Sequence, residues 1–157
     1  ILGSMVVSEI QLRSATIKDE SLLFKWRNID DLVALSYHQK KVTLSEHQQW
    51  FKRNLLSSDC ELFIIQLDNQ DIGLIRIEAV QAECEITIYL IPGNEGRGFG
   101  YSALSQALED NSIRCNVYIA KVQVKNIPSQ NLFKKLEFFE TFRDNSFILY
   151  KKPYILV

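Results

Sequence analysis

The chain has 157 residues, of which 46% are hydrophobic and 24% charged, and these values fit one globular domain with a buried core. Its formal net charge of −1 gives no electrostatic reason to expect nucleic acid or an anionic membrane as a partner, because both select for clustered Lys and Arg. There is no signal-peptide pattern and no apolar run as long as a membrane span, so we expect a cytoplasmic protein.

The cysteines and the first residues allow two further interpretations. Cys60, Cys84 and Cys115 are far apart and show neither CxxC nor Cys/His spacing, which argues against a disulfide framework and against zinc. We therefore expect a reducing compartment and no metal. Ile1 to Ser4 precede Met5 and are interpreted as the remnant of an expression tag, and residues 5–157 as a single domain.

The first third of the chain predicts a strand and two helices. Val6 to Arg13 alternates as a strand does. Thr16 then reads as an N-cap with Asp19 three residues later, in a capping-box-like pair, ahead of a helix with an apolar stripe of Leu22, Leu23 and Trp26. A second helix is predicted from Ser45, with Gln48 in the return position of the capping box, and it ends near Ser57.

The middle of the chain predicts an antiparallel meander. Three strand-like runs cover Leu62 to Leu67, Ile72 to Glu78 and Cys84 to Ile91, and the turn-like residues 68–71 separate the first two. A glycine-rich segment, Pro92 to Gly100, follows and leads into a helix with Leu104, Ala107 and Leu108 on one side.

The last third predicts a strand, a short helix and two closing strands. The strand covers Asn116 to Val124, and the helix runs from about Pro128 to Leu136, with proline where its missing N–H costs nothing. Phe138 to Phe142 and Phe147 to Lys151 are the closing strands. This order of helices and strands indicates an α+β or mixed-sheet domain.

Glycines at 96, 98 and 100 stand directly between a predicted strand and a predicted helix. Such a turn gathers main-chain N–H groups at a helix N-terminus, where the helix dipole also favours a phosphate, and Arg97 can add a charge-assisted contact. The alternative is a tight turn without a ligand. A Walker A loop is excluded because Tyr101-Ser102 follows the last glycine where Lys-Ser/Thr is needed, and a Rossmann loop would come earlier in the chain.

From Val7 to Tyr150, the order of elements and the segment Glu95-Gly96-Arg97-Gly98-Phe99-Gly100 resemble the GNAT acetyltransferase superfamily. The family pattern is Gln/Arg-x-x-Gly-x-Gly/Ala, and Glu95 departs from its first position. The resemblance implies an α+β fold with a mixed, mostly antiparallel sheet of about seven strands, flanked by about four helices. It also implies a splayed parallel strand pair that binds acetyl-CoA, with the pyrophosphate at the glycine turn.

A second family element is an Asn, a small residue and a helix that ends in Gly-Phe, and it resembles Asn126 to Phe138. Glu137 replaces the usual glycine, and Phe133 stands where many members have a tyrosine that acts as general acid, so that acid is not expected here. The cofactor contacts that the resemblance implies are Ile88, Leu90, Glu95, Gly96, Arg97, Gly98, Phe99, Gly100, Tyr101, Asn126, Ser129, Phe133 and Lys135.

A third element concerns the acceptor. Trp26-Arg27-Asn28, Ser36 and the segment Leu44 to Phe51 resemble GNAT enzymes that acetylate nucleotide-linked amino sugars, notably those of the pseudaminic-acid pathway. Ribosomal-protein and antibiotic acetyltransferases share part of this pattern. The implied substrate-binding residues are Arg27, Asn28, His47, Trp50 and Thr87. Trp26 and Trp50 also lie on apolar helical stripes, which favours a role in the core.

Acetyl transfer to an amine needs a base, an aligned thioester and hydrogen bonds to the oxyanion. Strand alternation puts Glu83, Glu85, Thr87 and Tyr89 on one face of the predicted strand. Glu85 is the candidate general base and Glu83 the alternative, although both could simply face water. Candidate proton donors to the CoA thiolate are Tyr89, which we select together with Glu85, and Tyr101 and Tyr118, which stay open.

Three functions are therefore compared. The first is acetyl-CoA-dependent N-acetylation of a nucleotide-linked amino sugar in surface-glycan biosynthesis. The second is acetylation of a protein N-terminus or lysine, as in the ribosomal-protein type, and the third is a non-catalytic acyl-CoA-binding module. The expected partners are acetyl-CoA and a small amine-bearing substrate, without nucleic acid or membrane, and the protein is expected to be a monomer or homodimer.

Overall fold

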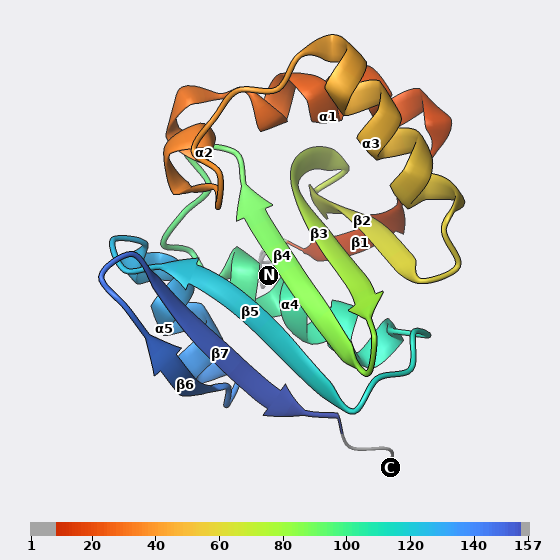
Figure 1. Ribbon diagram of the computed structural model, residues 1–157. Helices are drawn as coiled ribbons and strands as arrows, with labels where there is room; N and C mark the ends of the chain where they lie inside the picture. Colours follow the sequence, from red (N-terminus) through yellow and green to blue (C-terminus); the bar gives the residue numbers. More distant parts are fainter. Residues whose placement is uncertain (1–8, 155–157) are drawn as a thin grey trace, which may run out of the picture.

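The computed structural model describes residues 9–154 (Figure 1). The interpreted tag remnant at residues 1–4, and residues 6–8 of the predicted first strand, lie outside the described residues. One sheet of seven strands has the order β1-β2-β3-β4-β5-β7-β6. The strands are β1 Ile10–Ser14, β2 Cys60–Leu67, β3 Gln70–Val80, β4 Glu83–Leu90, β5 Val117–Gln123, β6 Phe139–Arg143 and β7 Phe147–Pro153.

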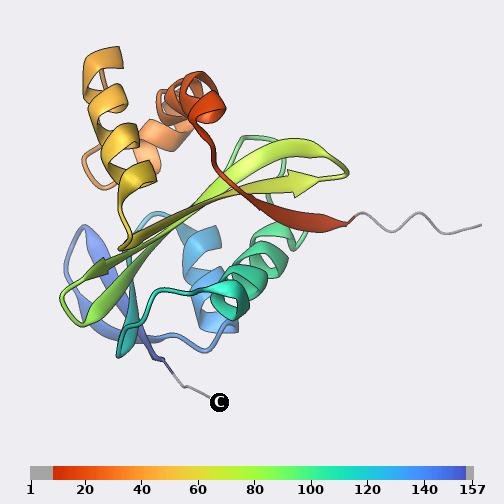
Figure 2. The ribbon, with the colours of Figure 1, turned by 90° about the vertical axis from the view of Figure 1, so that its right-hand side faces the viewer.

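Helices cover both faces of this sheet. They are the 3-10 helix η1 Ile17–Asp19 and the α-helices α1 Glu20–Arg27, α2 Asp30–Leu35, α3 Leu44–Leu56, α4 Phe99–Asp110 and α5 Ile127–Lys135. In Figure 2, α1 and α3 lie on one side of the sheet, and α4 and α5 lie on the other. None of the helices between residues 9 and 154 has the length and the apolar run that a bilayer span requires.

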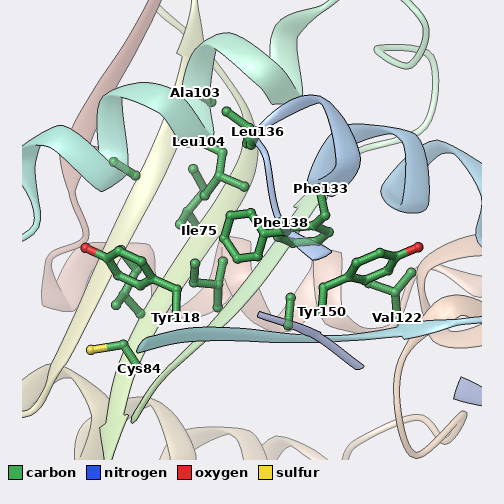
Figure 3. Packing of buried hydrophobic residues seen from close by; sticks show 14 of the residues in the cluster. Ile75, Cys84, Ala103, Leu104, Tyr118, Val122, Phe133, Leu136, Phe138 and Tyr150 are labelled. Carbon is green, nitrogen blue, oxygen red and sulfur yellow. The ribbon is translucent and has the colours of Figure 1, made fainter. Parts of the chain in front are cut away.

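Each face of the sheet has its own hydrophobic core. On the α4 and α5 side, Ile75, Leu104, Phe133 and Tyr150 belong to one large buried cluster (Figure 3). On the α1 and α3 side, a smaller cluster includes Trp26 and Phe51, among other residues. Strand β4 contributes to both clusters, so its two faces look toward different halves of the protein.

Strands β4 and β5 form the parallel pair of a sheet that is otherwise antiparallel. Their pairing covers only the first part of β4, Glu83 with Val117, Cys84 with Tyr118 and Glu85 with Ile119. Beyond these pairs the two strands diverge, as Figure 1 shows. The predicted α+β fold, with its mostly antiparallel sheet and its splayed parallel pair, is therefore confirmed.

Local sequence signals account for several element boundaries. Asp68 and Asn69 both have positive φ, 48° and 70°, and form the two-residue loop between β2 and β3 that fits the right-handed twist of a hairpin. The Thr16–Asp19 capping box is present, although it caps η1 before α1 begins.

One helix boundary was predicted wrongly. Helix α3 begins after Thr43, whose side chain accepts a hydrogen bond from the Glu46 N–H, and not at Ser45, because the Thr43/Glu46 pair forms the complete capping box two residues earlier. The five α-helices between residues 9 and 154 agree with the expected number of about four. Helix α2 was not predicted individually, since its six residues include no buried one and no side-chain cap, and so leave almost no periodic signal.

Candidate active site

The glycine turn after β4 adopts backbone conformations that suit glycine. Gly93, Gly96 and Gly98 have φ values of 97°, 74° and 79°, and Gly98 is the N-cap of α4. A Cβ added at Gly96 or Gly98 would meet no atom within 4 Å. The turn therefore leaves open space above the main-chain N–H groups at the start of α4, where a phosphate group would fit.

Side chains around this turn are held mainly by local contacts. A carboxylate oxygen of Glu95 accepts a hydrogen bond from the Gly93 N–H at 2.9 Å, so this residue stabilises the turn itself. The exposed Arg97 guanidinium lies 4.6 Å from the centre of the Phe99 ring. Lys135 Nζ lies 4.3 Å from the centre of the Tyr101 ring, which brings the end of α5 beside the first turn of α4.

The expected contacts on α5 fall into two groups. Asn126 caps this helix by accepting a hydrogen bond from the Ser129 N–H at 3.3 Å, and both residues lie near the end of β5. Phe133 instead lies in the core, 2% exposed, with its ring centre 5.1 Å from that of Phe138 and 6.1 Å from that of Tyr150 (Figure 3). Because phenylalanine has no hydroxyl, this position of α5 cannot supply a general acid.

The two faces of β4 separate as the alternation predicted. Ile88 and Leu90 pack against the core under α4 and α5, and Tyr89 packs against the core under α1 and α3. The face of Tyr89 also carries Thr87, which is exposed, and the half-buried Glu85. Glu85 belongs to the last residue pair that joins β4 to β5, so its carboxylate lies where the strands begin to separate.

Strand β3 adds charged residues to the same face of the sheet. Glu78 pairs with Glu85, and Arg76 pairs with Thr87. Arg76 forms an ion pair with Glu78 and donates a hydrogen bond to Asn54 Oδ1 at 2.9 Å. The ion pair neutralises Glu78, the carboxylate opposite Glu85. Sequence reasoning missed Arg76 and Glu78, although their spacing of two residues within a strand placed them on one face.

The alternative base and the alternative proton donors have different surroundings. Glu83 forms an ion pair with Lys151 at 3.5 Å. Tyr118 is 4% exposed, and its hydroxyl accepts a hydrogen bond from Asn111 Nδ2 at 2.9 Å. Burial raises the pKa of Tyr118 to about 12. Tyr101, by contrast, is 37% exposed on α4.

The last turn of α1 packs against the part of β4 that follows Glu85 and is not paired with β5. The Trp26 ring meets the Tyr89 ring edge-on, with 6.3 Å between their centres. Burial raises the pKa of Tyr89 well above its usual value, and the positive charge of Arg27 opposes the rise. A tyrosine hydroxyl is protonated near neutral pH in any case, and the raised pKa makes Tyr89 a weaker acid than an exposed tyrosine.

Two of the predicted substrate contacts have structural partners. The Asn28 side chain donates to the Val42 carbonyl at 2.9 Å and accepts from the Val42 N–H at 2.8 Å, which fixes the segment before α3. His47 is 2% exposed and its ring lies 5.6 Å from that of the half-buried Trp50 and 6.0 Å from that of Phe51. Burial lowers the pKa of His47, so the ring is neutral near pH 7.

The segment between α2 and α3 is attached to β5 and β7. Gln123 Nε2, at the end of β5, donates to the Ser36 carbonyl at 2.7 Å. The Tyr37 ring packs against Phe147 of β7, with 4.7 Å between the ring centres. This segment therefore bridges the α1 and α3 half of the protein to the far side of the parallel pair. Nothing in the sequence marked Gln123, because a single polar residue at a strand end has many uses.

These positions gather around the point where β4 and β5 stop pairing. The glycine turn at the start of α4 and Asn126 at the start of α5 follow the ends of these two strands. On the α1 side, Glu85, Thr87 and Tyr89 share one face of β4 and carry a carboxylate and two hydroxyl groups. Within residues 9–154, no group of three or more His, Cys, Asp or Glu residues lies close enough to hold a metal ion.

Comparisons with known proteins agree with this geometry. A family model described as an acetyltransferase (GNAT) domain matches residues 9–138. No curated protein matches the chain by sequence. Among solved structures, a domain from Methanocaldococcus jannaschii superposes with a TM-score of 0.80 and 24% identity, covering 94% of this chain and 99% of that one.

Two further structures are those of named enzymes. The spermidine N-acetyltransferase from Vibrio cholerae, in complex with CoA and spermine, has a TM-score of 0.79 and 15% identity, and the match covers 92% of this chain and 95% of that one. The Campylobacter jejuni N-acetyltransferase PseH, in complex with acetyl coenzyme A, has a TM-score of 0.67 and 22% identity, covering 92% and 99%. At these identities, the likeness establishes a shared fold.

Proposed function

Because this chain belongs to the GNAT acetyltransferase family, we propose that it transfers the acetyl group of acetyl-CoA to the primary amine of a nucleotide-linked amino sugar. The observation that carries the first half of this proposal is the junction of β4 and α4. The strand separates from β5 after Glu85, and the chain then turns through Gly96 and Gly98 into a helix N-terminus. We take the separated strands as the proposed place of the extended part of acetyl-CoA, and the turn as the proposed place of its phosphates.

The glycine turn is the proposed pyrophosphate site. Main-chain N–H groups of residues 96–100 would donate hydrogen bonds to it, and the α4 dipole would add favourable potential. Arg97 is exposed at the same turn and would supply a positive charge. Ile88 and Leu90 on β4 would border the pantetheine arm of acetyl-CoA. Asn126 and Ser129, which follow β5, would lie on the other side of this arm. The proposed contacts also include Gly100, Tyr101 and Lys135. Phe99 and Phe133 are buried in the core, so their side chains would act by packing under the turn and under α5.

Glu85 is the proposed general base. An amine attacks a thioester only as the neutral nitrogen, so the ammonium form must first lose a proton. The Glu85 carboxylate lies at the point where β4 and β5 part, on the face opposite α4, and can accept this proton directly or through a water. Thr87 is next along the same face and would orient the acceptor by a hydrogen bond.

Tyr89 is the proposed proton donor to the CoA thiolate that leaves. The proposal rests on its place on the same β4 face as Glu85 and on a hydroxyl that is protonated near neutral pH, as in any tyrosine. The amine enters from the α1 and α3 side, because α4 covers the other face of β4. The proposed acceptor-binding residues are Arg27, Asn28, His47 and Trp50. Asn28 and His47 are held in contacts with other residues of the protein, so they would position the surrounding segments and not bind the acceptor directly.

An amino-sugar acceptor is supported by the sequence. The Trp26-Arg27-Asn28 and Leu44 to Phe51 patterns resemble those of amino-sugar acetyltransferases. The fold does not select the acceptor, because it is shared by PseH and by an acetyltransferase for spermidine. We further propose that the protein works in the cytoplasm, because Cys60, Cys84 and Cys115 are all free thiols, as a reducing compartment would keep them.

A thiol-release assay tests this function. The protein is incubated with acetyl-CoA and, in separate reactions, UDP- or dTDP-linked amino sugars, peptides and polyamines, while free CoA is measured. We expect release with a sugar nucleotide, and mass spectrometry should find one added acetyl group on the sugar nitrogen. Release with peptides alone would assign protein acetylation instead. Tight CoA binding without release from any amine would indicate a non-catalytic binding module.

A further inference from the structure

The Arg27 guanidinium lacks a counter-ion in the part of the chain that the structure describes. Its Nη1 atom is buried without a hydrogen-bond partner, and no ion pair among residues 9–154 includes it. The other two half-buried arginines of the same range, Arg13 and Arg76, are each paired with carboxylates. Arg27 therefore differs from the arginines that stabilise this fold.

The position of Arg27 relates this charge to the reaction site. It is the last residue of α1, next to Trp26, whose ring contacts Tyr89 on the open part of β4. The charge of Arg27 acts on the Tyr89 hydroxyl and on His47. These neighbours lie on the side of β4 that faces away from α4, and hence away from the proposed pyrophosphate site.

A half-buried cation without a partner is unfavourable, because it loses hydration and gains no opposite charge. The α1 dipole offsets this cost only in part, by less than about 1 kcal/mol at a helix C-terminus. A ligand that binds on the α1 and α3 side of β4 can supply the negative charge that Arg27 lacks. We propose that Arg27 binds an anionic group, a phosphate or a carboxylate, that is carried by the amine acceptor itself.

This inference rests on the proposed acetyl transfer at Glu85, and it narrows the acceptor class. Tyr89 lies four positions after Glu85 on the strand, which corresponds to about 13 Å along β4. An acceptor whose anionic group is several bonds from its amine matches this separation better than an α-amino acid, in which both groups are on one carbon. A polyamine has no anionic group, and Arg27 would repel it.

The test compares acceptors that share one amine. UDP-glucosamine and glucosamine 1-phosphate carry phosphate, muramic acid carries a carboxylate, and methyl glucosaminide carries no charge besides its amine. Kinetics are measured for the wild type, Arg27→Gln, Arg27→Lys and the control Arg53→Gln, an exposed arginine on α3. Calorimetric binding of UDP-glucosamine to the CoA-loaded proteins gives a readout independent of turnover, and thermal melting checks the fold.

We expect Arg27→Gln to raise KM or Kd about tenfold for the acceptors with an anion, which is the scale of one charge-assisted contact, and to leave methyl glucosaminide and acetyl-CoA unchanged. Arg27→Lys should recover part of the loss, and Arg53→Gln should match the wild type. Comparison of the phosphate and carboxylate arms identifies the anion. An equal loss for charged and uncharged acceptors, or unchanged UDP-glucosamine affinity, would overturn the role of Arg27 while acetyl transfer stands. Absence of thiol release with every amine would instead refute the proposed function.

Discussion

The side-chain amide of Gln123 donates a hydrogen bond to the main-chain carbonyl of Ser36, with 2.7 Å between the two atoms. Eighty-seven positions separate these residues in the chain. The bond joins the end of β5 to the segment that connects α2 to α3, and so fixes this segment to one strand of the splayed pair. The other end of the segment is held by Asn28, which binds both main-chain groups of Val42.

Replacement of Gln123 by Met should release this segment. The Ser36 carbonyl loses its donor, which costs about 1 kcal/mol. Trypsin should then cleave faster after the exposed Lys40 or Lys41, and KM for the acceptor should rise while that for acetyl-CoA stays unchanged. Gln49→Met, at an exposed position of α3, is the matched control. Equal cleavage rates in both variants would show that the Gln123 bond does not hold the segment.

Replacement of Gly98 by Ala should weaken acetyl-CoA binding. At φ 79° a Cβ costs about 1 kcal/mol of strain, and it also points into the open space that we assign to the pyrophosphate. We expect affinity to fall roughly tenfold or more, because charge-assisted contacts are lost. Gly93→Ala is a close control, since Gly93 also has positive φ, 97°, but lies before the proposed nest. The phosphate assignment fails if calorimetry finds the same affinity for both variants.

Replacement of Glu85 by Gln should slow the chemical step without weakening the binding of acetyl-CoA. Loss of a general base lowers kcat by about 10²- to 10⁴-fold. Glu83→Gln should have a much smaller effect, because the Glu83 carboxylate faces Lys151 at 3.5 Å. Rates are to be measured from pH 6 to 9, since a missing base is partly replaced by hydroxide at high pH. The reverse ranking of the two variants would move the base to Glu83.

Replacement of Asp19 by Asn should make stability less dependent on pH. Hydrogen bonds from Arg13, at 2.8 and 2.9 Å, lower the pKa of Asp19 below its ordinary value of 3.8. The carboxylate therefore stabilises the fold above pH 3.8, and this contribution is lost as the pH falls through the lower, folded-state pKa.

Urea titrations at several pH values measure this effect. At pH 7 we expect Asp19→Asn to lose about 2–3 kcal/mol, because Arg13 keeps only Asp71 as a partner. The difference from the wild type should shrink below pH 3.8. A constant difference at all pH values would mean that the Asp19 charge is not the source of the stability. Asp68→Asn, at the exposed hairpin, serves as the control.

Short-range chemistry explains what could be predicted from the sequence. Alternating residues assigned the two faces of β4, and a capping box marked the start of η1. Glycines 96 and 98 identified the turn with positive φ, because few other residues adopt that conformation at low cost. Even Glu137, where the family has glycine, keeps the left-handed backbone at φ 66°, since the end of α5 demands it.

Contacts across the sheet could not be predicted in the same way. The sequence by itself determined every strand, every α-helix except α2, their approximate bounds and the family, because helix caps, strand alternation and glycine turns depend on residues only a few positions apart. Only the tertiary structure packed Trp26 against Tyr89, left Arg27 without a counter-ion among residues 9–154, neutralised Glu78 with Arg76, buried His47 among aromatic rings and attached Ser36 to Gln123. Those relationships join residues on different elements, and their partners are chosen by packing, which no local pattern records.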